Sequence, residues 1–389
     1  MNAAMDKRAM KGSNKKKILI VGVSDKVGGV EKFFYNMFSK PNDIFEIEFL
    51  TFFDVCAFED EYKKVGYKIH HFPSRRKNLL TFNKKVVAFF KENKDYDFIW
   101  INTSSTSMYQ VQYYAKKLTA AKVITHSHSV ALERNFKNIF DKMAYAVNIV
   151  LTYINKKKVV DNTDYFFACS KAAGVALFGK ENSSKIEVIN NGIDTEKFKY
   201  SDEARDLFRK ENNISKNTIV FSLVGRLAQP KNPLKAISIF SEYVKKNENA
   251  VLFIVGEGDL EELVKEEVKK RGLERLVLFL GLRQDIEKIL FATDVLIVPS
   301  IFEGLSMVAI EAQCTGAKCI LSNTVPKEAC ITDLVSFVDL EAPDLVWVES
   351  IIDSLKVKVN REKYSKIVRD EGFDTENTIR TIKKILLNK

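Results

Sequence analysis

Short, continuously apolar segments alternate with longer amphipathic ones along the chain, and this alternation is the feature that most constrains its fold. Residues 17–23 (KILIVGV) and 218–224 (TIVFSLV) each open a series of such segments. Apolar runs of this length between helical stretches are typical of parallel strands that are buried on both faces of a sheet. Two series in 389 residues therefore predict an α/β protein of two doubly wound domains.

The domain boundaries follow from turn signals. Asn190-Asn191-Gly192-Ile193-Asp194 is a turn signal that precedes a polar stretch, so we expect the domains to span 17–192 and 193–370. Residues 1–16 are expected to form a basic tail, and 371–389 a helix that packs back on the first domain. Further strands are expected at 44–49, 97–101, 122–125, 165–168, 187–189, 251–255, 277–280, 295–298 and 319–321. Helices are expected at 30–39, 82–92, 109–118 and 233–246.

The charge is distributed unevenly. Residues 1–200 hold 33 Lys and Arg against 21 Asp and Glu, an excess of +12, whereas residues 201–389 have a balance of −2. This asymmetry indicates that the first half meets a polyanion, such as nucleic acid, anionic lipid or a phosphorylated acceptor. No stretch has the roughly 18 consecutive apolar residues of a spanning helix, and five cysteines show no pairing pattern. We therefore expect a cytoplasmic protein.

The strongest chemical signal is the segment 299–311 (PSIFEGLSMVAIE), in which a strand leads through Glu303 and Gly304 into a helix expected at 305–311. A glycine lets the chain approach a ligand closely, and the free N–H groups of a first helical turn attract an anion such as phosphate. Glu303 and Glu311 could then hold hydroxylated sugars on either side of a diphosphate. The alternative is that Glu303 caps the helix and Glu311 is a solvated surface residue.

A basic pair follows the first strand of the second domain. Arg226 and Lys231 lie in the loop GRLAQPKN, where they could neutralise a diphosphate, or could be two ordinary surface cations. This loop and the Glu303 loop both follow strands of one predicted sheet. Ligands of such sheets bind beyond the carboxyl ends of the strands, so the loops can converge on one site.

Several segments together resemble the retaining glycosyltransferases of family 4, which have the two-domain GT-B fold with the active site in the cleft between facing Rossmann-like domains. The resemblance rests on VINNGID, GRLAQPKN, IVGEGDL, FLGLRQDI and DVLIVPSIFEGLSMVAIEA, and on THSHS near residue 126. THSHS and LSNTVPKEACITDL look like the capsular and exopolysaccharide branch of the family. At Thr324–Glu328 the chain departs from the glycine pair that many members have, so no contact is assigned there.

The resemblance implies a role for each matching residue. Arg226 and Lys231 match the diphosphate-binding pair, Glu311 the ribose-binding carboxylate, and Arg283 the position whose backbone contacts the base. Glu303 matches the residue that binds the transferred sugar, with the amides of Gly304, Leu305 and Ser306 near sugar and phosphate. In the first domain, Gly28 and Gly29 match the glycine loop over the diphosphate, and His126 the histidine beside the reacting sugar.

The sequence thus predicts a hexosyltransferase that uses a nucleoside-diphosphate sugar, with UDP as the expected nucleotide, and needs no metal or other cofactor. The expected acceptor is a lipid-diphosphate-linked glycan in capsule or exopolysaccharide synthesis at the inner face of the cytoplasmic membrane. A sugar-nucleotide epimerase and a non-catalytic sugar-nucleotide-binding subunit are the alternatives. No nucleic-acid-binding motif accompanies the charge, and the spacing of Gly22, Gly28 and Gly29 is not that of a dinucleotide fingerprint.

Three local patterns admit a second interpretation. Asp95 and Asp97 could be a metal-binding carboxylate pair, but polar residues at the start of a strand are the favoured interpretation. His126 and His128 could share a metal, but no third ligand is evident. Arg75–Lys77 with helix 79–94, and the stretch 135–160 that ends in Lys156-Lys157-Lys158, predict docking on an anionic membrane, unless these helices simply cover the sheet.

Overall fold

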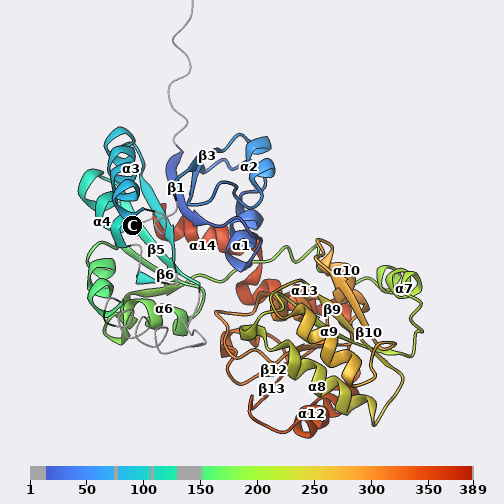
Figure 1. Ribbon diagram of the computed structural model, residues 1–389. Coiled ribbons are helices and arrows are strands. Elements are labelled where there is room, and N and C mark those ends of the chain that lie inside the picture. Colours follow the sequence, from blue (N-terminus) through green and yellow to red (C-terminus); the bar gives the residue numbers. More distant parts are fainter. Residues whose placement is uncertain are drawn as a thin grey trace, which may run out of the picture. The chain divides into compact units, whose positions relative to one another are not determined.

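The computed structural model describes residues 15–73, 78–103, 105–106, 109–128, 150 and 152–387. The described chain divides into two compact units, the first ending at Val188 and the second beginning at Ile189. Each unit has a parallel sheet with helices on both faces, as the alternation of apolar and amphipathic segments predicts (Figure 1).

The sheet of the first unit has the strand order β3-β2-β1-β4-β5-β6-β7 among the described residues. Its strands are β1 (Lys16–Val23), β2 (Phe45–Thr51), β3 (Lys68–His71), β4 (Phe98–Asn102), β5 (Lys122–Ser127), β6 (Tyr165–Ala168) and β7 (Ile186–Val188). Its helices are α1 (Gly29–Phe38), α2 (Glu59–Val65), α3 (Leu79–Glu92), α4 (Tyr109–Leu118) and α6 (Lys171–Phe178), and residues 152–161 are also helical.

The first sheet has apolar side chains on both of its faces, and helices pack against each face. Phe82 of α3 and Val111 of α4 pack with Ile99 and Ile101 in one core cluster. The residue between those two isoleucines, Trp100, faces the other way and contacts the rings of Phe33 and Phe34 of α1. Helices α3 and α4 therefore lie on one side of the sheet and α1 on the other (Figure 1).

The second sheet repeats the arrangement with the order β10-β9-β8-β11-β12-β13. Its strands are β8 (Ile219–Val224), β9 (Ala250–Val255), β10 (Val277–Gly281), β11 (Val295–Val298), β12 (Lys318–Ser322) and β13 (Val335–Val338). The helices of this unit are α7 (Asp202–Glu211), α8 (Pro233–Val244), α9 (Glu261–Lys270), α10 (Ile286–Ala292), α11 (Met307–Cys314), α12 (Asp344–Lys356), α13 (Tyr364–Val368) and α14 (Thr375–Leu387). Packing of the last helix on the first domain stays a prediction.

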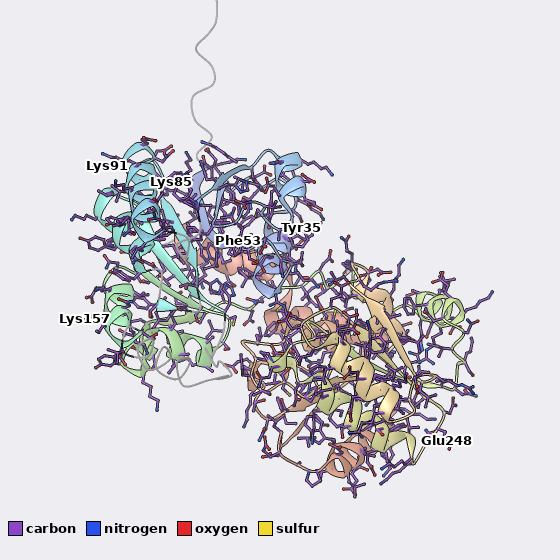
Figure 2. The ribbon with its side chains drawn as sticks, viewed as in Figure 1. Tyr35, Phe53, Lys85, Lys91, Lys157 and Glu248 are labelled. Atoms are coloured by element: carbon purple, nitrogen blue, oxygen red, sulfur yellow. The ribbon has the colours of Figure 1, made fainter. Side chains whose placement is uncertain are left out.

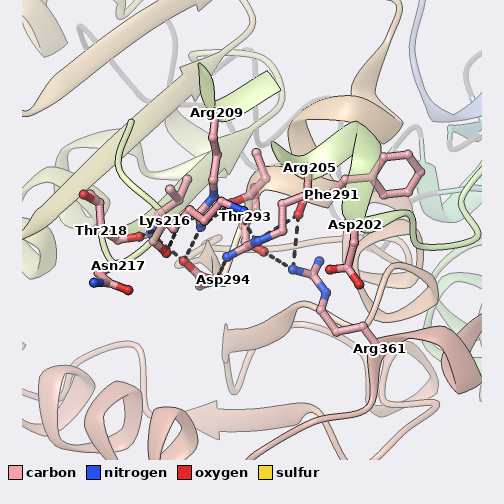
Figure 3. A network of polar contacts seen from close by, with 12 residues as sticks. Asp202, Arg205, Arg209, Lys216, Asn217, Thr218, Phe291, Thr293, Asp294 and Arg361 are labelled. Atoms are coloured by element: carbon pink, nitrogen blue, oxygen red, sulfur yellow. Dashed lines mark hydrogen bonds and ion pairs between the residues drawn. The ribbon is translucent and has the colours of Figure 1, made fainter. Parts of the chain in front are cut away.

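Three arginines anchor the start of β11, the strand that leads to Glu303. Figure 3 shows Arg205, Arg209 and Arg361 converging on the end of α10. Their guanidinium groups donate to the carbonyl oxygens of the last residues of that helix, which an α-helix leaves without internal partners. Asp294 accepts from both Arg205 and Arg209 at 2.7 Å. The network fixes both the end of α10 and the start of β11.

Candidate active site

The strand order of the second unit reverses between β8 and β11, because β9 and β10 lie on one side of β8 and β12 and β13 on the far side of β11. In an open parallel sheet, the loops that leave such a pair of strands run in opposite directions and open a crevice for a ligand. The loop after β8 carries Arg226 and Lys231, and the loop after β11 carries Glu303. The two loops meet, because the Ile301 N–H donates to the Pro230 carbonyl oxygen at 2.8 Å, so their predicted convergence is confirmed.

An ion pair crosses this crevice. The Lys231 Nζ lies 2.5 Å from the Glu303 Oε1, and the Ser300 hydroxyl donates to the same oxygen at 2.8 Å. The Lys231 side chain is 27% exposed and that of Glu303 10%, so the pair is only partly screened by water. Both donors meet Oε1, and Oε2 has no hydrogen-bond partner within the described chain, which leaves it available to a ligand hydroxyl.

Three glycines let the loops of this crevice pack backbone to backbone. Gly225 and Gly256 have φ values of +142° and +120°, which side chains rarely adopt. A Cβ at Gly256 would lie 2.1 Å from the carbonyl oxygen of Gly225, and one at Gly258 would lie 2.3 Å from that of Leu227. The sequence alone did not lead us to assign a role to the two glycines of IVGEGDL. The signal was present, since two glycines directly follow an apolar strand.

The helix after Glu303 begins later than predicted. We expected it at Leu305, but α11 begins at Met307, because Ser306 has a left-handed backbone (φ 57°, ψ 76°) that stops the helix from extending backwards. The positive φ of this loop therefore lies at Ser306. Leu305 and Ser306 are both buried, and the Ser306 hydroxyl has no hydrogen-bond partner in the part of the chain that the structure describes. A buried hydroxyl at a helix N-terminus suits an anionic oxygen.

The other predicted donor-site residues of the second unit differ in exposure. Glu311 is 6% exposed on α11, so the interpretation of it as a solvated surface residue is wrong. Arg226 is exposed and forms no ion pair with the described residues. Arg283 follows β10, and its guanidinium forms a two-pronged ion pair with Asp285 at 2.8 Å. This hydrogen bond raises the pKa of Arg283, and the contact of the Arg283 backbone with a base stays a prediction.

In the first unit, α1 begins at the predicted glycine pair. Gly28 is the N-cap residue and Gly29 the first helical residue, and no side chain caps the helix. A carboxylate lies at this end, however. Glu31 is buried, accepts a hydrogen bond from the Ser24 N–H at 3.0 Å, and would contact a Cβ at Gly28 at 2.9 Å. A diphosphate here would meet that negative charge, and the contact of Gly28 and Gly29 with it stays a prediction.

His126 lies within β5 and is fully buried, at 0% exposure. Its ring packs against Phe33, Trp100 and Phe167 at centroid distances of 5.3, 5.8 and 6.0 Å. Burial, with a smaller effect of His128, lowers the pKa of His126 well below its usual value. The predicted contact of His126 with the reacting sugar therefore requires the ring to become exposed. It stays a prediction.

A residue that sequence reasoning missed lies next to this histidine. Asn102, the last residue of β4, is paired with His126 in the sheet register, and its Oδ1 lies 3.1 Å from the Nε2 of His128. The only sequence signal was a polar residue at the end of an apolar strand (DFIWIN). The two histidine rings are 3.9 Å apart, but no group of three metal-ligating side chains is found in the described ranges.

The contacts of Asp95 and Asp97 do not support their interpretation as a metal-binding carboxylate pair. Asp97 accepts from the backbone N–H of Lys17 at 2.9 Å, and Asp95 pairs with the Lys17 Nζ at 2.8 Å. Both carboxylates hold the start of β1 in place, so they are polar residues at a strand start, which was the favoured interpretation.

Within the described ranges, no helix is both long enough and apolar enough to cross a membrane.

Models of two protein families match successive parts of the chain. The family described as "Glycosyltransferase Family 4" matches residues 27–197, and "Glycosyl transferases group 1" matches residues 204–369. The two matches correspond to the two units.

Individual proteins match over most of their length. Putative glycosyltransferase EpsF of Bacillus subtilis is 27% identical over 94% of this chain and 95% of its own. UDP-Gal:alpha-D-GlcNAc-diphosphoundecaprenol alpha-1,3-galactosyltransferase of Escherichia coli is 28% identical over 80% of each chain. Among solved structures, Alr3699/HepE of Anabaena in complex with UDP-glucose has a TM-score of 0.75 at 20% identity, covering 96% of this chain and all of that one.

The structural likeness shows the fold, and the family matches agree with the chemistry of the crevice between β8 and β11. The chain belongs to the group 1, family 4 glycosyltransferases and is an enzyme with the GT-B fold.

Proposed function

We propose that this enzyme moves a hexosyl unit, with retention of configuration, from a UDP-sugar to a lipid-diphosphate-linked glycan in capsule or exopolysaccharide synthesis. The observation that carries the proposal is the Lys231–Glu303 pair at the strand-order reversal, directly before the N-terminus of α11. The pair offers a cation and a carboxylate at one place, which suits a substrate with both a diphosphate and sugar hydroxyls.

The reaction releases a diphosphate, which gains negative charge as the bond to the sugar breaks. Lys231, Arg226 and the backbone N–H groups at the start of α11 would stabilise this charge, because they are in place before the reaction begins. The buried Ser306 hydroxyl would donate to a phosphate oxygen. These fixed donors would do the work that a divalent cation does in other transferases, so we expect activity to survive chelation.

The remaining donor contacts follow the predicted assignment. The free Oε2 of Glu303 would accept hydrogen bonds from hydroxyls of the transferred sugar, and Glu311 from those of the ribose. The backbone at Arg283 would contact the base. Removal of a single preorganised donor from a developing anion lowers kcat by about 10²- to 10³-fold, so each cation here should matter measurably.

Relatives support the donor and acceptor classes. The Escherichia coli relative is named for UDP-Gal as donor and for an acceptor linked to diphosphoundecaprenol, and the Anabaena structure was solved with UDP-glucose. We infer from these names that the present enzyme uses a UDP-hexose and an acceptor of the polyprenyl-diphosphate type.

A thermal-shift panel of nucleoside-diphosphate sugars, followed by a transfer assay with a polyprenyl-diphosphate-linked sugar, tests the proposal. We expect a UDP-hexose to raise the Tm, and the product to have the anomeric configuration of the donor by NMR. Conversion of the donor without an acceptor would indicate an epimerase, and binding without turnover a non-catalytic subunit. Loss of activity with EDTA, restored by a divalent cation, would contradict the metal-independent mechanism.

We also propose that the first domain docks on the anionic inner face of the cytoplasmic membrane, where the acceptor resides. The structure describes only some of the residues from which this docking was predicted, and it buries others. Arg75–Lys77, and residues 135–149 and 151 of the second stretch, lie outside the described residues. Phe82, Val86, Phe89 and Phe90 of α3 are buried in the core, so this apolar face covers the sheet and is not available to a membrane.

What remains exposed is a basic surface with a few apolar side chains. Figure 2 shows Lys85 and Lys91 of α3 and Lys157 pointing outward from the first unit. Beside the lysines, Leu80 is 74% exposed and Tyr153 80% exposed. Each cation near anionic lipid contributes on the order of 1 kcal/mol, so three or four would give salt-sensitive binding.

Vesicle sedimentation tests the docking. We expect binding to vesicles that contain anionic lipid, no binding to neutral ones, and weaker binding at high salt or after Lys156/Lys157/Lys158→Glu. The same triple substitution should leave the Tm shift by the donor intact. Sedimentation that is independent of lipid charge would contradict the proposal.

A further inference from the structure

The loop that follows β12 is fastened to the chain on both sides of Glu303. On the near side, the Thr324 hydroxyl donates to the Ser300 carbonyl oxygen at 2.6 Å. On the far side, Gln313 of α11 donates through its side-chain amide to the Ala329 carbonyl oxygen at 2.7 Å. The loop from Thr324 to Ala329 therefore holds the two segments between which Glu303 lies.

Two hydroxyl groups meet the Ser300 carbonyl oxygen at the start of this loop. The Ser322 Oγ also lies 2.6 Å from that oxygen, and it lies 2.8 Å from the Thr324 Oγ1. Ser300 and Ser322 are fully buried, whereas Thr324 is exposed. Each hydroxyl has one hydrogen, so two hydrogens serve three short contacts. The carbonyl oxygen consequently keeps a donor when either hydroxyl is removed alone.

Ser300 connects this loop to the Glu303 carboxylate. Its carbonyl oxygen accepts from the loop, and its hydroxyl donates to the Glu303 Oε1 at 2.8 Å, the oxygen that Lys231 also contacts. The position of the Ser300 backbone therefore decides where its hydroxyl points, and with it the orientation of the carboxylate. A glycine, which many family members have in the segment of Thr324, offers no hydroxyl. The contact thus depends on a residue by which this chain departs from them.

We propose that Thr324 is a positioning residue for sugar transfer: its hydroxyl fixes the Ser300 carbonyl group, and Ser300 in turn aligns Glu303 with the transferred sugar. The inference rests on the proposed function, because it takes the hexosyl unit as the ligand of Glu303. Thr324 acts through Ser300 and transfers no proton. A misaligned Glu303 impairs the contact with the sugar and not the contact with the nucleotide, so Thr324 governs turnover rather than the binding of UDP.

Three substitutions at Thr324 separate the hydroxyl from its position. Thr324→Ser retains the hydroxyl, Thr324→Ala leaves Ser322 as the donor, and Thr324→Val places a methyl group where the hydroxyl lay. A methyl group cannot approach an oxygen to 2.6 Å, so Thr324→Val displaces Ser300. We expect it to lower kcat about 10- to 100-fold, with a smaller loss for Ala and wild-type kcat for Ser.

The Tm shift produced by UDP alone should be the same in all three variants and in the wild type. Equal kcat values for Thr324→Val and Thr324→Ser would overturn the proposal. A UDP-induced shift that is lost in Thr324→Val would overturn it as well, because the substitution would then disturb nucleotide binding.

A second set of variants tests whether the effect passes through Glu303. In a Glu303→Ala background, Thr324→Val should lower kcat/KM clearly less than in the wild type, because the group that Thr324 positions is already absent. The matched control is Thr293→Val at the other end of β11, where the buried hydroxyl donates to the Ile289 carbonyl oxygen at 2.7 Å. It should lower the Tm and leave kcat/KM unchanged in both backgrounds. An equal loss from Thr324→Val in both backgrounds would contradict the role of Glu303.

The link from Thr324 to Glu303 is also tested without substrate, by urea unfolding of the same variants. The losses of unfolding free energy from Thr324→Val and Glu303→Ala should not add, because both residues contact Ser300, whereas those from Thr293→Val and Glu303→Ala should add. Additive losses at Thr324 would overturn the positioning role even in an enzyme that transfers sugar. Non-additive losses in an enzyme that transfers no sugar would support the link and contradict the proposed function.

Discussion

Removing the charge of Lys231 should separate its role in catalysis from its role in stability. In Lys231→Met, the leaving diphosphate of the proposed reaction would lose a fixed cation, and Glu303 loses its partner at 2.5 Å. The first loss should lower kcat by about 10²- to 10³-fold, or about 3–4 kcal/mol of transition-state stabilisation. The second leaves a carboxylate that is only 10% exposed unpaired beside the substrate anion, which adds repulsion.

A double-mutant cycle with Glu303→Gln measures how strongly the two residues are coupled. Close, partly buried charge pairs give coupling energies of about 1.5 kcal/mol or more. The double variant should therefore lose at least about tenfold less in kcat/KM than the product of the two single losses. The assay is initial-rate transfer from the preferred donor at saturating acceptor, with the Tm of each variant recorded alongside.

The matched control is Lys235→Met. Lys235 lies one turn further along, in α8, is exposed to a similar degree, and forms an ion pair of 2.8 Å with Asp344 rather than with a site residue. It should lower the Tm by an amount comparable to Lys231→Met and leave kcat within about threefold. The reasoning is refuted if Lys231→Met lowers kcat less than tenfold, or if the losses of Lys231→Met and Glu303→Gln simply multiply.

Three further predictions concern the framework of the site. Burial raises the pKa of Glu48, but hydrogen bonds from His70, Tyr96 and Lys17 outweigh it and lower that pKa to about 2. Because a depressed carboxyl pKa stabilises the fold above its unfolded value of about 4.5, the stabilisation, about 3 kcal/mol, should disappear as the pH falls from 5 to 2. Urea unfolding of Glu48→Gln should show a deficit at pH 7 that shrinks at pH 3, and a constant deficit would contradict the assignment. Gly256→Ala should abolish the donor-induced Tm shift, since its Cβ would overlap the Gly225 carbonyl oxygen, whereas Gly272→Ala, with open space around it, should retain the shift. Asp294→Ala leaves Arg205 and Arg209 without their anion and should lower the free energy of unfolding by about 3–5 kcal/mol, measured by urea denaturation; a loss below 1 kcal/mol would show that the carbonyl contacts suffice.

The sequence predicted the architecture well because apolar strand patterns are local. The strand expected at 165–168 and the helix expected at 109–118 agree with β6 and α4 to the residue. The strands β3 and β13 were missed, since each has only four residues, lies at a sheet edge and is incompletely buried. The start of α11 was missed because it depends on the left-handed backbone of Ser306, and the presence of a serine does not predict that conformation.

The sequence could predict which loops form the candidate site, but not which atoms within it form hydrogen bonds. The rule that ligands bind beyond strand ends brought Lys231 and Glu303 together correctly, and the place of Arg226 in the site stays a prediction. It could not show that Ser300 and Lys231 share one oxygen of Glu303. Nor could it identify the contact of Asn102 with His128, because the orientation of the Asn102 amide depends on a hydrogen bond to a carbonyl oxygen 81 residues away in the sequence.

The two units share one strand order around the reversal, yet the chemistry that each presents there is opposite. In the second unit, Lys231 and the exposed Arg226 supply positive charge to the crevice. In the first unit, the corresponding helix start carries the buried carboxylate of Glu31. Neutral Asn102 and His128 occupy the adjoining strand ends. A diphosphate gains little from a surface that already holds a negative charge, whereas a sugar hydroxyl needs only a neutral acceptor. The same topology therefore presents cations in the second unit and a buried carboxylate with neutral side chains in the first, and the side chains, not the fold, decide that difference.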